Sequence, residues 1–399
     1  MAHGSGTGEG MAAGASRRMI LVVVPWSCKW RGGVSTVVRS LSEQWQAAGL
    51  RHEVVVDDWA AGTLDTGAEE WHFRFVVMAA TTPVAGIRAL PGALRTMFRL
   101  WRALKSQDCV AINFHYPGIN ALGVALLKRL GLWRGRLVLS FHGTDVRVPR
   151  SRAECWAWQT IFAECNGITT CSGSLLNRLA QTMGAPMHIS KVVYNGVDAD
   201  LFAPRAASDT LRLRTKPRSE VALSIGGYIP RKGHRTLLLA FARLAQSHPD
   251  LRLVIAGQDG EERAPLTELA RTLGLHERVA LKYDLEPRDV VALLHEACLV
   301  VQPSLEEPFG LAVIEAAACG VPVAVSAVGG HLEIVKDGLT GHVFQPDDPE
   351  ACATAVAAVL ADPDEARKRA DHLRAEVLRR FTWEGCAERY RALLQGESR

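Results

Sequence analysis

The stretch SLEEPFGLAVIEAAACG, residues 304–320, lies between two apolar runs of the chain, residues 297–301 and 321–325. Each run is short and uncharged, which predicts a buried strand. The residues between the runs predict a loop and then a helix that begins at about Gly310 or Leu311. A strand, a helix and a further strand in succession are typical of a parallel sheet covered by helices.

Two glutamates lie eight residues apart in this stretch. Glu307 falls in the predicted loop and Glu315 in the first two turns of the helix, a spacing that lets both carboxylates face one ligand. The amides of Phe309, Gly310 and Leu311 would open at the helix N-terminus, which suits a phosphate. Taken singly, either glutamate is equally consistent with an ordinary solvated acid near a helix start.

The whole string closely resembles the acid-x7-acid motif of the family 4 retaining glycosyltransferases, which have the two-domain GT-B fold. The resemblance implies that Glu307 lies near the donor sugar and that Glu315 binds the ribose hydroxyls. It also implies an α/β fold of two Rossmann-like, doubly wound domains facing across a cleft. A C-terminal helix is then expected to cross back to the first domain.

Length and composition fit a protein of this class. With 399 residues, 48% hydrophobic and 22% charged, the chain is long enough for two or three globular domains. No apolar run reaches the length of about 18 residues that a membrane-spanning helix needs. The nine cysteines show no paired or metal-binding spacing, which favours a reducing, cytoplasmic compartment. Nothing in the sequence predicts a nucleic-acid partner.

Strand-like and helix-like segments alternate along the chain, and the alternation breaks at residues 195–220. Turn residues there are followed by a polar, basic stretch, and residues 195–198 resemble the NGVD segment that ends the first domain in family 4 enzymes. We predict a flexible tail at 1–18, an acceptor-side Rossmann-like domain at 19–200, a nucleotide-sugar-binding Rossmann-like domain at 201–380, and a C-terminal helix at 381–399 that packs on the first domain.

Hydrophobic periodicity places the individual elements. We predict strands at 19–24, 53–56, 73–78, 109–114, 136–140, 168–171, 221–225, 251–256, 279–281 and 298–301, helices at 34–48, 91–105, 120–130, 152–164, 174–183, 350–380 and 383–394, and an irregular loop at 60–70. Ligands of such sheets bind at the carboxyl ends of strands, so functional residues should directly follow strands.

The loop GGYIPRKG, residues 226–233, follows one of these predicted strands. Its glycines allow a close backbone approach to a ligand, and its cations could neutralise a diphosphate leaving group. Alone, the loop is as consistent with an ordinary surface turn. The resemblance assigns Lys232 to the donor phosphates. The family's arginine falls on Gly227, which leaves open whether Arg231 takes its place.

The first domain offers further candidates after its own predicted strands. Gly33 opens a helix, so its amide could face a phosphate. Residues 141–145 resemble the family's HGTD-like motif, which implies that His142 holds a hydroxyl of the donor sugar and that Asp145 orients a loop or an acceptor hydroxyl. His115 is expected to line the acceptor cleft. A single histidine after a strand is otherwise consistent with a purely structural residue.

The predicted helix at residues 91–105 has an apolar and a basic face. Arg95, Arg99 and Arg102 share one side, and the apolar set at helical spacing is Leu94, Met97, Phe98, Trp101 and Leu104. A basic amphipathic helix can lie on an anionic membrane. The alternative is a surface helix whose apolar stripe meets its own sheet.

The resemblance covers nearly the whole chain from Met19 onward. It implies a retaining enzyme of the hexosyltransferase type that moves a sugar from a nucleotide-diphosphate sugar, UDP- or GDP-linked, to a sugar, lipid-linked or small-molecule acceptor in polysaccharide, glycolipid or glycoconjugate synthesis. No Asp-x-Asp motif follows a strand, so basic residues are expected to do the work of a metal ion, and no cofactor is expected. Two alternatives stay open: a sugar phosphorylase or nucleotide-sugar epimerase on the same fold, and a non-catalytic sugar-nucleotide-binding protein, which the missing arginine at Gly227 suggests.

Overall fold

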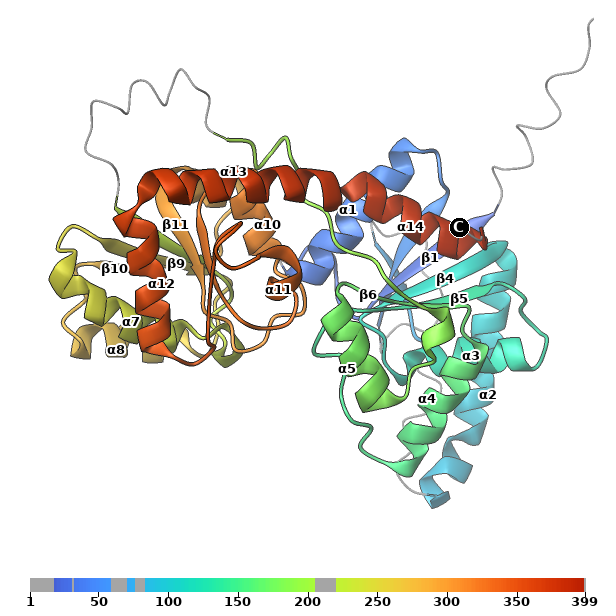
Figure 1. The fold of residues 1–399 in the computed structure, drawn as a ribbon. Helices are drawn as coiled ribbons and strands as arrows, with labels where there is room; N and C mark the ends of the chain where they lie inside the picture. The colour runs from blue at the N-terminus through green and yellow to red at the C-terminus, as the bar shows by residue number, and fades with distance from the viewer. Residues whose placement is uncertain (1–17, 31, 59–69, 76–82, 205–219, 398–399) are drawn as a thin grey trace, which may run out of the picture. The chain divides into compact units, whose positions relative to one another are not determined.

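The computed structural model describes residues 18–30, 32–58, 70–75, 83–204 and 220–397 (Figure 1). The chain divides into two compact units, each with its own sheet. The first unit holds Met1–Thr170, Leu176–Val193 and Ala387–Arg399, and the second holds Cys171–Leu175 and Tyr194–Cys386. Three predicted features lie largely outside the described residues: the tail at 1–18, of which Arg18 alone is described, the loop at 60–70, and the polar, basic stretch that leads up to Glu220.

The first unit is built on a parallel sheet whose described strands run in the order β3-β2-β1-β4-β5-β6-β7. The interior strand MILVVV, residues 19–24, is buried along its whole length, which is typical of a strand covered on both faces. The strands are β1 (Met19–Val24), β2 (His52–Asp57), β3 (Trp71–Phe73), β4 (Cys109–His115), β5 (Arg136–Phe141), β6 (Gly167–Thr170) and β7 (Ser190–Val192).

Helices cover both faces of this sheet (Figure 1). α3 packs beside α2 and α4, whereas α1 lies with the C-terminal α14 (Trp383–Gln395) on the opposite face. The helical elements are α1 (Gly33–Ala47), α2 (Pro83–Ser106), η1 (Ile119–Ala121), α3 (Leu122–Arg129), α4 (Arg152–Glu164), α5 (Gly173–Met183) and η2 (Met187–Ile189).

The second unit repeats the plan with a parallel sheet whose described strands run in the order β10-β9-β8-β11-β12-β13. These strands are β8 (Val221–Ile225), β9 (Arg252–Gly257), β10 (Val279–Tyr283), β11 (Ala297–Gln302), β12 (Val323–Ser326) and β13 (His342–Phe344). The helical elements are η3 (Pro230–Lys232), α7 (His234–Ser247), α8 (Arg263–Thr272), α9 (Pro287–Glu296), α10 (Leu311–Ala318), α11 (His331–Ile334), α12 (Pro349–Ala361) and α13 (Pro363–Arg380).

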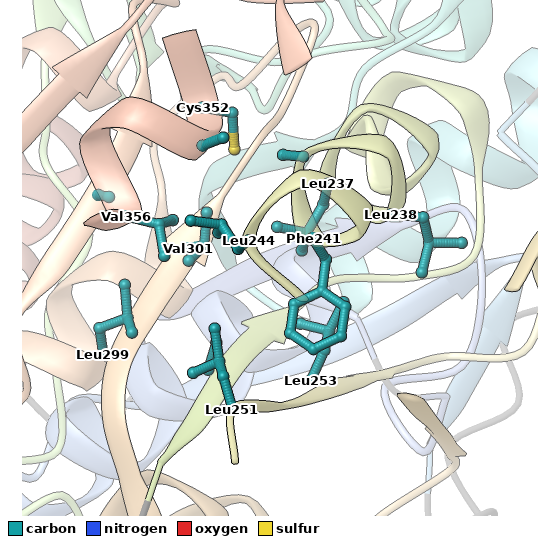
Figure 2. Close-up of a cluster of buried hydrophobic side chains, with 14 of the residues drawn as sticks. Leu237, Leu238, Phe241, Leu244, Leu251, Leu253, Leu299, Val301, Cys352 and Val356 are labelled. Carbon is teal, nitrogen blue, oxygen red and sulfur yellow. The ribbon is translucent and has the colours of Figure 1, made fainter. Parts of the chain in front are cut away.

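The core of the second unit lies where α7 and α12 pack over the strands (Figure 2). α7 contributes apolar side chains at helical spacing, and Phe241 among them is 1% exposed. The labelled members of this cluster are Leu237, Leu238, Phe241, Leu244, Leu251, Leu253, Leu299, Val301, Cys352 and Val356.

The predicted helix at 350–380 is wrong in one respect, because two helices occupy these residues. α12 ends at Ala361 and α13 begins at Pro363. Asp362 has a non-helical conformation, and its side chain accepts a hydrogen bond from the amide of Glu365, 3.0 Å away. Proline in a first helical turn together with an N-cap aspartate starts a new helix rather than continuing an old one.

Three other elements differ from their predictions in more than a shift of one or two residues at an end. α2 begins at Pro83, so Pro91 lies inside the helix instead of starting it. The helix predicted at 120–130 begins with the 3₁₀ turn η1 before α3. Of the strand predicted at 73–78, only Phe73 belongs to β3, and residues 76–78 lie outside the described part of the chain.

The longer of the two segments that make up the second unit begins at Tyr194 and ends at Cys386. Hydrogen bonds attach the start of this segment to its end. The Val197 amide donates to the Phe381 carbonyl at 3.0 Å, and Val197 forms a parallel bridge with Thr382. This pairing attaches the turn that follows residue 194 to the segment after α13.

The last helix, α14, supplies Ala387 and the residues after it to the first unit. Trp45 of α1 is 1% exposed, and its Nε1 donates to the Ala387 carbonyl at 3.1 Å. Arg136 of β5 donates through Nε to the Leu393 carbonyl at 2.7 Å. The first unit is therefore completed by residues far along the chain.

Among the described residues, no helix is both long and apolar enough to cross a membrane. Their His, Cys, Asp and Glu side chains form no group of three or more that could hold a metal ion. The nine cysteines are all free thiols.

Replacing Phe241 with alanine is expected to lower the free energy of unfolding of the second unit by about 3–5 kcal/mol, because the change leaves a cavity in its core. Denaturant titration followed by far-UV circular dichroism measures the loss. Phe98→Ala is the matched control, since Phe98 is 58% exposed. Equal losses at the two positions would contradict the placement of Phe241 in the core.

Candidate functional site

The chain changes direction across the second sheet between β8 and β11. It leaves β8 for β9 and β10 on one side, and β11 leads to β12 and β13 on the other. The loops at 226–233 and 303–310 therefore leave the same edge of the sheet, and the Leu305 amide donates to the Arg231 carbonyl at 2.8 Å. Doubly wound sheets bind their ligands at such a point.

Lys232 and Glu307 form an ion pair that joins these two loops. Nζ of Lys232 lies 2.7 Å from Oε2 of Glu307, and the Ser304 hydroxyl donates to the same oxygen at 3.1 Å. The Lys232 and Glu307 side chains are only 20% and 11% exposed. Two residues that the sequence indicated separately are thus in direct contact.

The surroundings of Glu307 fix its charge. Burial works to raise the pKa of its carboxyl, but the Lys232 ammonium, His331 and hydrogen bonds from Lys232 and Ser304 outweigh burial and hold that pKa below its usual value. Glu307 is therefore a carboxylate at neutral pH, which accepts hydrogen bonds and donates none.

His331 is a third member of this cluster, to which the sequence prediction gave no role of its own within a mostly structural segment at 328–335. It is fully buried, with Nε2 3.9 Å from Oε2 of Glu307 and Nδ1 3.1 Å from the Ser326 carbonyl oxygen. Nδ1 must donate to that carbonyl, so Nε2 carries a lone pair, and within the described residues it has no hydrogen-bond partner. Burial lowers the pKa of His331 despite the opposing effect of Glu307, so the ring stays neutral.

Glycine is required at two points of close approach in this cluster. Gly233 has φ +66°, and a Cβ there would lie 2.0 Å from the Pro303 carbonyl oxygen. Gly329 has φ +43°, and a Cβ there would lie 2.0 Å from the Glu307 carbonyl oxygen. A larger residue at 233 would push apart the loops that carry Lys232 and Glu307, and one at 329 would push the Glu307 loop away from the loop after β12.

The N-terminus of α10 is open. Its N-cap, Gly310, has φ +117°, and no side chain caps the helix. In the described part of the chain, no acceptor is found for the amides of Phe309, Gly310 and Leu311. The Phe309 ring is 3% exposed and packs 5.5 Å from the Phe381 ring, which anchors the residue before the helix. Unpaired amides at a helix start can bind an anion.

Two further candidates lie close in sequence to the members of the ion pair: Arg231 directly precedes Lys232, and Glu315 lies eight residues after Glu307. Glu315 lies in α10 and is half-buried, and burial raises the pKa of its carboxyl to about 7. The Arg231 guanidinium forms no ion pair with any described residue. Gly227 is not crowded, since a Cβ there would meet the Gln258 carbonyl oxygen at an ordinary 3.6 Å. Sterics therefore do not explain why glycine stands at 227.

In the first unit, the corresponding change of direction lies between β1 and β4. Gly33 is exposed and is the first residue of α1, whose N-terminus has no side-chain cap. Trp26 follows β1, and its ring lies 5.0 Å from that of Tyr116, which follows β4. The loops after these two strands therefore meet.

His142 and His115 are hydrogen-bonded to each other, with His115 Nδ1 3.0 Å from His142 Nε2. Burial lowers the pKa of His142 to about 4 and that of His115 well below its usual value, so both rings are neutral. His115 is 1% exposed, and Asn113 lies 2.8 Å from its other nitrogen. Both ring nitrogens of His115 therefore have protein partners, and the expectation that His115 lines an acceptor cleft stays a prediction.

Asp145 braces the loop that carries His142. Its carboxylate accepts hydrogen bonds from the backbone amide of His142 at 2.9 Å and from that of Gly143 at 2.6 Å. Burial raises the pKa of Asp145 to about 6, against these amides and the Arg178 charge, which act to lower it. These hydrogen bonds tie the Asp145 carboxylate to the backbone at residues 142–143.

Comparison with known families covers most of the chain. The model described as Glycosyl transferases group 1 matches residues 211–374, and the one described as Glycosyltransferase Family 4 matches residues 31–201. D-inositol 3-phosphate glycosyltransferase of Corynebacterium glutamicum (strain R) is 34% identical over 300 residues, 71% of each chain. Glycogen synthase of Mycobacterium tuberculosis (strain CDC 1551 / Oshkosh) is 35% identical over 241 residues, 59% of this chain and 56% of that protein. The match thus spans little more than half the length of that relative.

Solved structures share the architecture. Sucrose-phosphate synthase from Thermosynechococcus elongatus superposes with a TM-score of 0.74 at 22% identity, covering 95% of this chain and 98% of that one. Anabaena HepE in complex with UDP-glucose gives 0.72 at 21% identity, covering 94% and 99%. The likeness confirms the predicted fold class of two Rossmann-like domains.

Replacing Lys232 with methionine should destabilise the protein by about 3 kcal/mol at neutral pH, because it leaves a buried carboxylate without its cation. In the wild type the folded pKa of Glu307 lies below the unfolded value of about 4.3, so the stabilisation is complete above that pH and is lost as pH falls through the folded pKa. In the variant, burial raises the folded pKa, so stability falls as pH rises. The difference in unfolding free energy between the two proteins should therefore shrink on acidification, as measured by urea titration at a series of pH values.

Lys336→Met is the control, because Lys336 pairs with Glu376 but is 57% exposed. Removing this surface pair should cost less than about 1 kcal/mol. A Lys232→Met loss that is as small as this, or that does not depend on pH, would contradict the assignment of a buried, charged pair.

Proposed function

The chain belongs to the family 4 glycosyltransferases of group 1, and from that premise we propose that it transfers a sugar from a nucleotide-diphosphate sugar to an acceptor hydroxyl with retention of configuration. The observation that carries the proposal is the buried Lys232–Glu307 ion pair beside the open N-terminus of α10. Together they offer a cation, helix N-terminal amides for which the described residues provide no acceptor, and a carboxylate that accepts hydrogen bonds. These groups lie at the edge of the sheet where nucleotides bind.

Lys232 and the start of α10 balance the charge of the diphosphate. A phosphate beside Lys232 gives its ammonium a second anionic partner, and the amides at 309–311 donate further hydrogen bonds. Arg231 lies on the same loop, and its guanidinium forms no ion pair with the residues that the structure describes, which makes it the candidate to replace the arginine absent at Gly227. With these groups, charge build-up on the leaving diphosphate is stabilised without a requirement for a metal ion.

Glu307 and Glu315 take different parts of the donor. Glu307 is ionised and accepts hydrogen bonds from the sugar hydroxyls. Glu315, with a pKa of about 7, binds the ribose hydroxyls as either donor or acceptor. The bond from the anomeric carbon to the diphosphate breaks, the bond to the acceptor oxygen forms on the same face, and the acceptor proton leaves with the diphosphate.

The first unit contributes His142, which hydrogen-bonds a hydroxyl of the donor sugar. The Gly33 amide at the start of α1 faces phosphate or acceptor. Asp145 acts by holding the His142 loop, and His115 acts by holding the His142 ring.

A UDP-sugar is the favoured donor, with a GDP-sugar as the alternative. Support comes from the similar HepE structure, which was solved with UDP-glucose. The acceptor is a sugar, a lipid-linked sugar or a small hydroxyl compound, as the names of the inositol phosphate and glycogen enzymes suggest for a varied family. The product then belongs to polysaccharide, glycolipid or glycoconjugate synthesis.

UDP is expected to raise the melting temperature more than GDP or ADP. A nucleotide at a hundred times its Kd stabilises the native state by about 2.7 kcal/mol. For a protein of this size, that stabilisation raises the melting temperature by about 3 °C. Differential scanning fluorimetry with each nucleotide and its sugar measures it. Equal, negligible shifts with all three would contradict a nucleotide site.

Glu307→Gln separates a transferase from the alternatives. Wild-type protein should release UDP from UDP-glucose, and the variant should do so at least about a hundredfold more slowly while keeping its circular dichroism spectrum. Binding of UDP without turnover by the wild type would favour a non-catalytic protein. Turnover that requires inorganic phosphate would favour a phosphorylase.

The outer face of α2 supports a second proposal, that the protein attaches peripherally to an anionic membrane on the cytoplasmic side. Residues 91–106 contain no acid, and Arg95, Arg99 and Arg102 are exposed. On the same outer face, Leu94 is 62% and Phe98 58% exposed. Basic and apolar side chains on one helix face suit phospholipid headgroups. The free thiols favour a reducing compartment.

The triple variant Arg95→Gln, Arg99→Gln, Arg102→Gln should lose binding to vesicles that contain phosphatidylserine, because each basic residue near such a surface contributes about 1 kcal/mol. Co-sedimentation at low and high salt measures binding. Arg243→Gln, Arg367→Gln, Arg379→Gln removes three exposed arginines from other helices and is the control. No sedimentation of the wild type with anionic vesicles would end this proposal.

A further inference from the structure

A row of polar side chains crosses the buried interior of the first sheet. His115 on β4 pairs in register with Ser140 on β5, and Ser140 pairs with Thr169 on β6. Asn113 and His142 lie two residues before His115 and two after Ser140, so alternation along the strands brings them to the same face. We call these five residues the polar row. All except the half-buried His142 are at most 1% exposed.

Hydrogen bonds connect the polar row from end to end. Thr169 Oγ1 donates to Ser140 Oγ at 2.9 Å, and Ser140 Oγ donates to Asn113 Oδ1 at 2.8 Å. With Oδ1 engaged by Ser140, the amide turns Nδ2 toward His115, whose Nε2 is 2.8 Å away. His115 Nδ1 then lies 3.0 Å from His142 Nε2.

The chemistry of these groups sets where each proton lies. An amide nitrogen only donates, so Nε2 of His115 must accept. The neutral His115 ring therefore carries its proton on Nδ1 and donates it to Nε2 of His142. By the same argument the neutral His142 ring carries its proton on Nδ1. Among the described residues, the hydrogen bond found for the His142 ring is the one through Nε2, and none is found for Nδ1.

Tyr390 of α14 closes the far end of the polar row. Its hydroxyl lies 3.1 Å from Thr169 Oγ1, and its ring lies 5.5 Å from the His115 ring. Trp45 holds the same helix in place through the Ala387 carbonyl. The last helix thus covers the polar row and excludes water that could rearrange its hydrogen bonds.

We propose that Asn113 is a positioning residue that acts through His115 to fix the tautomer of His142, so that His142 presents an Nδ1–H donor to the substrate. His142 is then no general base, because Nε2 already accepts a bond from His115 and Nδ1 already carries a proton. The low pKa values of both rings agree with this, since neither ring takes a second proton at neutral pH. The identity of the bound group as a sugar hydroxyl rests on the proposed function, whereas the tautomer does not.

The first test reads the tautomers directly. In protein labelled with 15N-histidine, imidazole 15N shifts should show Nδ1 protonated and Nε2 unprotonated in both His115 and His142, with signals assigned from His115→Asn and His142→Asn. Asn113→Leu removes the donor at similar volume and should return His142 to a mixture of tautomers. A proton on His142 Nε2 in the wild type, or an unchanged tautomer in Asn113→Leu, would overturn the proposal.

Ser140→Ala is the milder second variant, in case Asn113→Leu does not fold. Loss of the Ser140 hydroxyl frees the Asn113 amide to flip, and Ser140→Thr should restore the wild-type signals. Thr160→Val is the control, because it exchanges a buried threonine, 3% exposed, on α4 of the same unit. This control should leave the His142 signals unchanged.

The second test measures UDP release from UDP-glucose. Asn113→Leu should lower kcat about tenfold, the equivalent of one hydrogen bond in the transition state, and change KM for UDP-glucose by less than about twofold. An unchanged kcat together with a changed tautomer would refute the role given to the His142 donor. Absence of turnover in the wild type, with the predicted tautomer present, would instead refute the proposed function and leave the positioning role intact.

Discussion

A lysine and a glutamate that are both largely withdrawn from water constrain the whole second unit. Desolvating two charges is costly, and the cost is offset only when their geometry is held closely. The structure achieves this by placing Lys232 and Glu307 on loops that leave adjacent strands, β8 and β11, at the same edge of the sheet. Gly233 and Gly329 allow the surrounding backbone to close to contact distance. The parallel sheet, the short loops and the glycines thus all serve to hold the two buried charges at contact distance.

Both units bury polar side chains, and they satisfy those side chains in different ways. The second unit places a full positive and a full negative charge in contact, with a neutral His331 beside them. The first unit buries uncharged groups, the polar row, whose hydrogen bonds all run in one direction. A charged pair suits an anionic ligand, whereas a directed neutral network suits a hydroxyl.

Much of this architecture could be predicted from the sequence, because the spacing of apolar residues indicates which faces of the strands and helices are buried. β1, β8 and α4 have the bounds that periodicity gives. The break at Asp362 was missed because α12 and α13 are both helical and only a cap separates them. At the site, the motifs indicated Lys232 and Glu307 individually, but their contact depends on which strands are neighbours. The roles of Asn113 and Ser140 depend on strand register, which a single sequence does not reveal; polar residues at alternate positions of apolar strands were the only signal.

The return of α14 to the first unit has a consequence for biosynthesis. The residues that cover Trp45 and His115 begin at Ala387, after the whole second unit has been translated. While the ribosome is still making the second unit, the first sheet is exposed on the face that Tyr390 will later cover. The interior of the first unit therefore remains incomplete until nearly the entire chain has been synthesised. During this interval its exposed apolar surface is a target for chaperones.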